Sequence, residues 1–251
     1  MGAGGYNEQK FKERIKEIQE NDRAYWFGIG DMGDFIFYSD PRFTINAWTT
    51  LTMDDMRNVM QKHISKIVDV LEPIRDKCLG YGAGNHEEKA AKYYHTDPTI
   101  EVANRLKVKY MGYSALATLI FRKPKTPNGK KDRAYTLRVY MHHGFGGGRT
   151  HGAQINKVEQ MVMAYEADIY AMGHVHGKVA SKTNRIHTDQ TGRPVKKTKA
   201  FLVTSSYQNV AVPGATTYAE RMGFRESELM APTVKFRFAH KRQLLDLEVV
   251  V

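Results

Sequence analysis

Four short motifs in this chain combine a glycine turn with side chains that can bind metal ions. They are Gly30-Asp31-Met32-Gly33-Asp34, Gly84-Asn85-His86-Glu87, His142-His143-Gly144 and Gly173-His174-Val175-His176. Each motif follows a stretch that is typical of a buried strand, and ligands at strand ends can converge at one edge of a sheet. Oxygen and imidazole ligands favour Mn, Fe, Zn or Mg over metals that prefer thiolates. The motifs therefore predict a metal site.

The periodicity of apolar residues predicts the elements that carry these motifs. Helical spacing predicts helices over 7–20, 52–74, 98–106 and 152–166. Short apolar or alternating stretches predict strands over 24–29, 79–83, 116–121, 135–141 and 168–172, and the chain is β-rich from residue 179 onward. Helices and strands that alternate before a β-rich half indicate an α/β domain built on a sheet sandwich. No repeat or break in composition divides the chain, so we expect one domain over residues 1–251.

The composition limits the class of protein. At 251 residues, with 41% hydrophobic and 26% charged residues, the chain is typical of a soluble globular domain. Cys78 is the only cysteine, which excludes an intrachain disulfide and argues against a thiolate metal site. No apolar run reaches the roughly 18 residues of a membrane span, and the N-terminus has no signal-peptide core. We expect a cytoplasmic protein that does not insert into membranes.

Basic residues exceed acidic ones by 38 − 27 = 11, and the excess is concentrated in two segments. Residues 122–149 contain eight basic residues against one acidic residue, and residues 178–199 contain seven against Asp189 alone. Such segments favour polyanions, because neutralising phosphates releases condensed counterions. Solvated hairpin faces of a basic protein have the same composition. The charge pattern alone therefore leaves a nucleic-acid partner and a merely solvated surface both open.

Taken in order, the four motifs resemble the calcineurin-like metallophosphoesterase superfamily. That family's pattern has five blocks, and residues 30–176 contain the last four of them. Any one block arises by chance fairly often, whereas all four in order, each after a strand-like stretch, are specific. The resemblance implies a two-layer β-sandwich flanked by helices, with two divalent metal ions (Mn, Fe, Zn or Mg) at the sheet edge.

The resemblance also implies a role for each ligand. Asp31 would bridge both ions, and His176 would serve the first of them. The second ion would be bound by a neutral amide oxygen and two imidazoles, from Asn85, His143 and His174. His143 is preferred to His142 as a ligand because it directly precedes Gly144.

Three further residues near these motifs have expected roles. His86 would stand near the leaving oxygen as a general acid or a stabiliser of the transition state. Asp34 would support His86 or the turn rather than bind metal. Arg149 follows the glycine-rich stretch 144–148 and would bind substrate phosphate. A flexible loop with a solvated Arg149 is the alternative.

The family's first block, Asp-x-His, has no counterpart in this chain. In the family it lies about 25 to 35 residues before the Gly-Asp-x-x-Asp block, which here falls before Met1. We expect that the numbered chain lacks its first strand, and the alternative is a divergent member that has lost one metal site. Asp31 and His176 alone would then remain for the first ion, so one bound ion is the alternative to two.

The function expected from these residues is hydrolysis of a phosphodiester or phosphomonoester by metal-activated water. A nucleic acid or nucleotide is the favoured phosphate-ester substrate because of the basic segments. The alternative is a catalytically impaired, basic nucleic-acid-binding module that has lost one metal site. An Asp-x-His encoded in frame upstream of Met1 would favour the enzyme.

Overall fold

A computed structural model describes residues 6–35, 58–122, 134–189, 191–211, 231–238 and 245–250, together with 220, 223 and 229. In chain order the elements are α1 (Glu8–Glu20), β1 (Trp26–Ile29), α3 (Val59–Leu71), a 3₁₀ helix (Glu72–Lys77), β2 (Cys78–Gly82), α4 (Asn85–Tyr94), α5 (Pro98–Leu106), β3 (Tyr110–Gly112), β4 (Ser114–Arg122), β5 (Ala134–His142), α6 (His151–Gln160), a 3₁₀ turn (Met161–Met163), β6 (Ile169–Met172), β7 (Val179–Thr188), β8 (Pro194–Val203), β9 (Thr233–Phe238) and β10 (Leu245–Val250).

These elements match most of the predicted ones, but two were not predicted. They are α4, a helix of ten residues that begins at Asn85, and the short strand β3. The predicted helix over 52–74 corresponds to α3, and its residues 52–57 lie outside the described residues. Residues 123–133, which contain much of the first basic segment, also lie outside them.

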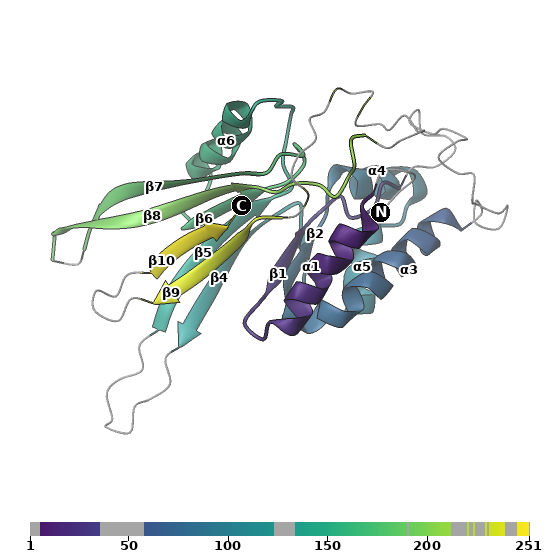
Figure 1. Cartoon of the computed structure of the whole chain (residues 1–251), viewed down its shortest axis with the longest axis horizontal. Coiled ribbons are helices and arrows are strands. Elements are labelled where there is room, and N and C mark those ends of the chain that lie inside the picture. The colour runs from purple at the N-terminus through teal and green to yellow at the C-terminus, as the bar shows by residue number, and fades with distance from the viewer. Residues whose placement is uncertain are drawn as a thin grey trace, which may run out of the picture.

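The strands form two main sheets and a hairpin. Strands β1, β2 and β3 form a parallel sheet in the order β1-β2-β3. A mixed sheet has the order β4-β5-β6-β8-β7, in which β5, β6 and β8 run parallel and β4 and β7 pair antiparallel at its two edges. Strands β9 and β10 pair antiparallel with each other (Figure 1).

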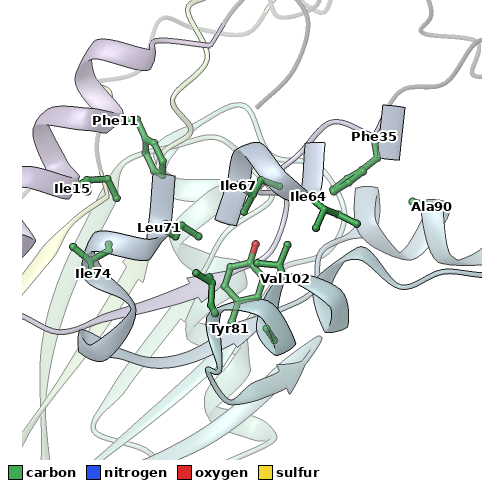
Figure 2. Close-up of a cluster of buried hydrophobic side chains, with 12 residues drawn as sticks. Phe11, Ile15, Phe35, Ile64, Ile67, Leu71, Ile74, Tyr81, Ala90 and Val102 are labelled. Atoms are coloured by element: carbon green, nitrogen blue, oxygen red, sulfur yellow. The ribbon is translucent and has the colours of Figure 1, made fainter. Parts of the chain in front are cut away.

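Three helices cover the outer face of the parallel sheet (Figure 1). Helix α1 begins where the Asn7 side chain accepts the Lys10 N–H, and α5 begins where Asp97 accepts two backbone N–H groups. Apolar residues of α1, α3 and α5 form one buried cluster with Tyr81 of β2, and Figure 2 shows the Tyr81 ring near Ile67 and Val102. Each fully buried aliphatic side chain in this cluster stabilises the fold by about 1.5–3 kcal/mol. The members labelled there include Phe11, Ile15, Ile64, Ile67, Leu71 and Val102.

Strand alternation gives the mixed sheet two apolar faces. One face packs against Phe27 and Ile29 of β1 and Met111 of β3, and its side chains come from β5, β6 and β8 (Leu137, Val139, Met141, Ile169, Ala171, Ala200 and Leu202). The intervening residues point the other way, toward Val158 of α6 (Tyr140, Tyr170, Met172, Phe201 and Val203). The layers therefore run helix, sheet, sheet, helix. This confirms the α/β class, with a parallel sheet and a mixed sheet flanked by helices.

In the described part of the chain, no helix is long and apolar enough to cross a membrane.

Candidate metal centre

The predicted motifs follow the carboxyl ends of parallel strands and meet where the two sheets face each other. Asp31 follows β1, Asn85 follows β2, His143 follows β5 and His174 follows β6. The carbonyl of Ile29, the last residue of β1, lies 2.7 Å from Nδ1 of His143, which joins the two sheets at this edge. Three of the predicted ligands, Asp31, His143 and His174, offer ligand atoms that lie within 4.8 Å of one another.

Glu87 fixes the loop that presents Asp31. Its carboxylate is 3% exposed and accepts the backbone N–H groups of Asp31 at 2.9 Å, Met32 at 2.8 Å and Gly84 at 3.0 Å. The pKa of Glu87 is raised to about 7, mainly by burial and next by the charge of Asp31. The backbone N–H groups act in the opposite direction and lower the pKa, but they do not outweigh burial. Glu87 is the third residue of α4, and its bond from the N–H of the N-cap residue Gly84 is the half of a capping box that a glycine N-cap allows.

The Asp31 carboxylate lies between α4 and His143. Its Oδ1 accepts the backbone N–H of His86 at 3.0 Å, and its Oδ2 lies 3.2 Å from Nε2 of His143. Burial by itself raises the pKa of Asp31, but the hydrogen bonds and positive charges of His143 and His86 bring that pKa well below its ordinary value. Asp31 is therefore an anion at neutral pH.

Asn85 and the two histidines complete the cluster. Oδ1 of Asn85 lies 3.0 Å from Nε2 of His143 and 2.8 Å from Nδ1 of His174. An octahedral ion with bonds of about 2.1 Å separates adjacent ligand atoms by about 3.0 Å. The separations of 2.8–3.2 Å between neighbouring atoms of this cluster match that spacing.

His143 supplies the chemical test of whether a cation fits. A carbonyl oxygen can only accept, so Nδ1 of His143 donates to Ile29 and the neutral ring keeps a lone pair on Nε2. That lone pair faces Asp31 Oδ2 and Asn85 Oδ1, which are also acceptors. Burial lowers the pKa of the His143 ring, but the hydrogen bond to Asp31 and the Asp31 charge outweigh it and raise the pKa above its ordinary value. Three acceptors around one point require a proton or a cation between them, and a divalent ion fits the donor set.

The backbone is held in an uncommon conformation at this cluster. Asp31 has φ +53°, His174 has φ +67° and His176 has φ +52°. Positive φ is uncommon for residues other than glycine, and it persists where the surrounding structure over-determines it. Of the other described residues of this kind, His95 and Lys107 are helix C-caps. Phe35, in the loop of Asp31, has φ +43°, so three of the predicted ligands are among the strained residues of their loops.

The adjacent histidines have different surroundings, which supports the choice of His143. His143 is 1% exposed and points Nε2 at the cluster, as described above. His142 accepts the Gly144 N–H at Nδ1, at 2.9 Å, and its ring packs edge-on against Tyr113 and Phe145. His142 therefore shapes the loop.

His86 and Asp34 lie together beside the cluster. Nδ1 of His86 is 3.8 Å from Oδ1 of Asp34, and both side chains are mostly buried. This is the distance of an ion pair when His86 is protonated, and it agrees with the supporting role predicted for Asp34. The positive charge of His86 contributes to lowering the pKa of Asp31, so the ring lies near the proposed ligands.

His176 and Arg149 are not brought into the cluster. His176 lies outside the described group whose ligand atoms are within 4.8 Å of one another, although burial, opposed by the Asp31 charge, lowers its pKa. Arg149 is exposed, and its Nη1 lies 3.7 Å from where a Cβ on Gly223 would be.

Sequence reasoning missed two residues that position the loops. One is Glu87, which could have been indicated by its place three residues after Gly84, where a glutamate can accept the N–H of an N-cap residue. The other is Gln154 of α6, 5% exposed, whose Nε2 donates to the carbonyls of Gly148 at 3.0 Å and Val175 at 3.1 Å. Gln154 ties the glycine-rich loop to the loop of His174, and no local pattern marks it.

Comparisons of the chain with protein-family models, curated proteins and solved structures find no match. The functional interpretation therefore depends on the motifs and on the geometry of the site.

Proposed function

We propose that this protein is a metal-dependent phosphoesterase in which Asp31, Asn85, His143 and His174 bind one metal ion, the second ion of the family pattern. One observation carries the proposal: Nε2 of His143 faces two oxygens that can only accept, 3.0 and 3.2 Å away. The order of the motifs and the helix-sheet-sheet-helix layers agree with the metallophosphoesterase resemblance, and that resemblance supplies the reaction class.

The donor set suits phosphate chemistry. A divalent ion at this cluster would supply positive charge that polarises a phosphoryl oxygen and favours attack by water. With one carboxylate, one neutral amide and two neutral imidazoles, the ligands offset one of the ion's two positive charges and leave a net charge of about +1 for an anionic substrate. The other ion of the family pattern would be bound by Asp31 and His176 with ligands outside this set.

The remaining residues orient the site and handle the proton. His86 would protonate the leaving oxygen, and Asp34 would hold its ring at 3.8 Å in the orientation for that transfer. Glu87 would keep Asp31 in place through the backbone, and Gln154 would keep the loop of His174 in register with the glycine-rich loop. Arg149 would contact the substrate only if its exposed side chain turns toward the cluster.

The test combines metal analysis with turnover. The protein is freed of metal with EDTA, titrated with Mn²⁺ by calorimetry, and assayed with bis(p-nitrophenyl) phosphate and p-nitrophenyl phosphate. We expect binding of at least one ion and hydrolysis that depends on it, and His143→Gln should abolish both whereas the control His142→Gln should retain both. Failure of the wild-type protein to bind Mn²⁺, or hydrolysis that persists in EDTA, would refute the proposal.

The impaired binding module is the second candidate function. It is favoured by the single group of three potential metal ligands found among the described residues. In the same experiment, tight binding of one ion without turnover of either ester would support it over the enzyme.

A further inference from the structure

The hairpin of β7 and β8 extends beyond the rest of the mixed sheet. Strand β6 pairs with β8 only from Ala200 to Val203, whereas β7 and β8 continue pairing from Thr183↔Lys199 to Thr188↔Pro194. These six pairs form a two-stranded ribbon about 17 Å long, at about 3.4 Å per residue. Figure 1 shows the ribbon projecting past β5 and β6, away from α4. We call residues 183–188 and 194–199 the β7–β8 ribbon.

The β7–β8 ribbon and its junction with the sheet present cations on both faces. Alternation places Arg185 and Lys197, which are directly opposite each other, on the face that continues toward α6. Lys196, together with Lys182 at the junction, lies on the other face. All four side chains are exposed, and Ile186, opposite Lys196, is 73% exposed, so neither face of the ribbon is covered there.

Three of these cations have no ion-pair partner in the described part of the chain, because Arg185, Lys196 and Lys197 form no salt bridge there. An acid near Arg185 is shared: Glu166 pairs with buried Lys199 at 2.7 Å, which lowers the pKa of Glu166, and the charge of Arg185 contributes to that lowering. Oδ1 of Asp189 accepts two backbone N–H groups of its own turn. Two cations directly opposite each other destabilise a hairpin by a few tenths of a kcal/mol up to about 1 kcal/mol. An anionic partner would offset that cost.

The shape and side chains of the ribbon favour a nucleic-acid duplex over a membrane. An element that lies on a membrane has an apolar face with Trp, Phe or Leu, and residues 178–199 contain none of these. The cations are instead interleaved with hydrogen-bonding side chains such as Thr183, Asn184 and Thr198. A major groove about 12 Å wide admits a two-stranded ribbon and has phosphates along both walls, which matches cations on both faces.

We propose that the β7–β8 ribbon binds the phosphate backbone of a nucleic-acid duplex along a groove, through Arg185, Lys196 and Lys197. The binding does not depend on the metal centre. The further statement that the bound duplex is also the substrate rests on the proposed phosphoesterase function.

The test measures binding of the full chain to a fluorescent 20-base-pair DNA duplex by anisotropy, in EDTA so that binding is scored without turnover. The ribbon variant is Arg185→Thr, Lys196→Thr, Lys197→Thr, because threonine retains strand propensity. The control variant is Lys12→Gln, Lys16→Gln, Arg23→Gln, which removes the same charge from exposed positions in and after α1. Circular dichroism and thermal melting verify that each variant folds.

We expect the ribbon variant to bind the duplex up to about 500-fold more weakly at 0.1 M salt, since each lost phosphate contact is worth about 0.9 log unit there. The slope of log Kd against log salt should fall by about 2.7 for the three contacts. The control should remain within about threefold of wild type. The ribbon variant should hydrolyse bis(p-nitrophenyl) phosphate as the wild type does, so a failure of the metal centre is distinguishable from a failure of the ribbon.

Several results would overturn the proposal. The first is that the wild-type protein does not bind the duplex, and the second is that both variants bind it equally more weakly than wild type. The third is that the wild-type protein binds vesicles of phosphatidylserine and phosphatidylcholine more tightly than the duplex. The fourth is that it binds a single strand of 20 nucleotides more tightly than the duplex. The last two results would assign the charges to a membrane surface or to a single-stranded ligand.

Discussion

Gly84 is the position where adding one methyl group should disable the proposed metal centre. Its φ of −121° is open to any residue, so Gly84→Ala tests space alone. A Cβ there would lie 2.2 Å from Oδ1 of Asp31, 2.5 Å from the Asp31 backbone nitrogen and 2.7 Å from Cε1 of His143. Two of these atoms belong to proposed ligand side chains, and the third belongs to the backbone that carries one of them.

The required displacement can be worked out from these distances. Ordinary contact begins at about 3.4 Å, so the neighbours of Gly84 would have to move by 0.7–1.2 Å. Metal sites tolerate deviations of about 0.2 Å in ligand distance. Overpacking of this kind costs about 1–3 kcal/mol of stability. We therefore expect Gly84→Ala to lose about 3 kcal/mol of stability and to weaken Mn²⁺ binding about 100-fold, the upper end of the effect of altering a ligand's support.

The matched control is Gly152→Ala in the first turn of α6, where a Cβ would meet nothing within 4 Å. That substitution should stabilise the protein by about 0.5 kcal/mol, because alanine favours helix. Urea unfolding in EDTA measures the stability of both variants, and Mn²⁺ calorimetry measures the site. Mn²⁺ affinity of Gly84→Ala within threefold of wild type would show that Asp31 and His143 do not hold the ion.

Three further predictions concern other residues. Asn85→Ala should weaken Mn²⁺ binding as measured by calorimetry, whereas His86→Ala should retain the ion and slow turnover by about 10²–10⁴-fold. If both variants lost the metal equally, His86 would not have the proposed role in proton transfer. Burial lowers the pKa of His63 to about 4, below its ordinary value of about 6.5. The folded state thus binds fewer protons than the unfolded state, and about 3 kcal/mol of stability present above pH 6.5 should be lost as the pH falls to 4. Urea unfolding at a series of pH values should detect this loss. The substitution His63→Gln should make the free energy of unfolding depend less on pH. Lys199→Ala should lower the free energy of unfolding in urea by about 3 kcal/mol, because it removes a buried aliphatic chain and leaves the Ala167 carbonyl without its hydrogen-bond donor. The control Lys197→Ala, at an exposed position, should lower it by under about 0.5 kcal/mol.

The motif residues were predictable because strand ends limit where they can lie. Gly30-Asp31 and Gly173-His174 each follow a short apolar strand, and parallel strands bring their carboxyl ends to one edge. The choice of His143 over His142 had a weaker basis, a following glycine. The structure supplies the physical reason, since the Ile29 carbonyl orients the His143 ring from the other sheet.

Other features could not be obtained from local patterns. Helix α4 was missed because only Glu87 and Ala90 are buried along its ten residues, so it has no apolar stripe to recognise. Its stability depends on the contacts of Glu87 with a loop 54 to 56 residues away in sequence. The link from Gln154 to Gly148 and Val175 likewise depends on how α6 packs on the sheet.

The fold separates the two proposed sites along the strands of one sheet. The metal ligands follow the carboxyl ends of β5 and β6, whereas the ribbon lies beyond the amino end of β6. From Val203, at the metal edge, to Lys197 is six residues of β8, or about 20 Å at about 3.3 Å per residue. At about 3.4 Å per base pair that span corresponds to about six base pairs. A mononucleotide therefore cannot contact both places, whereas a duplex can. The ribbon would accordingly increase the affinity for polymeric substrates and leave the hydrolysis of small esters unchanged, because its cations lie too far from the cluster to stabilise charge on a reacting phosphate.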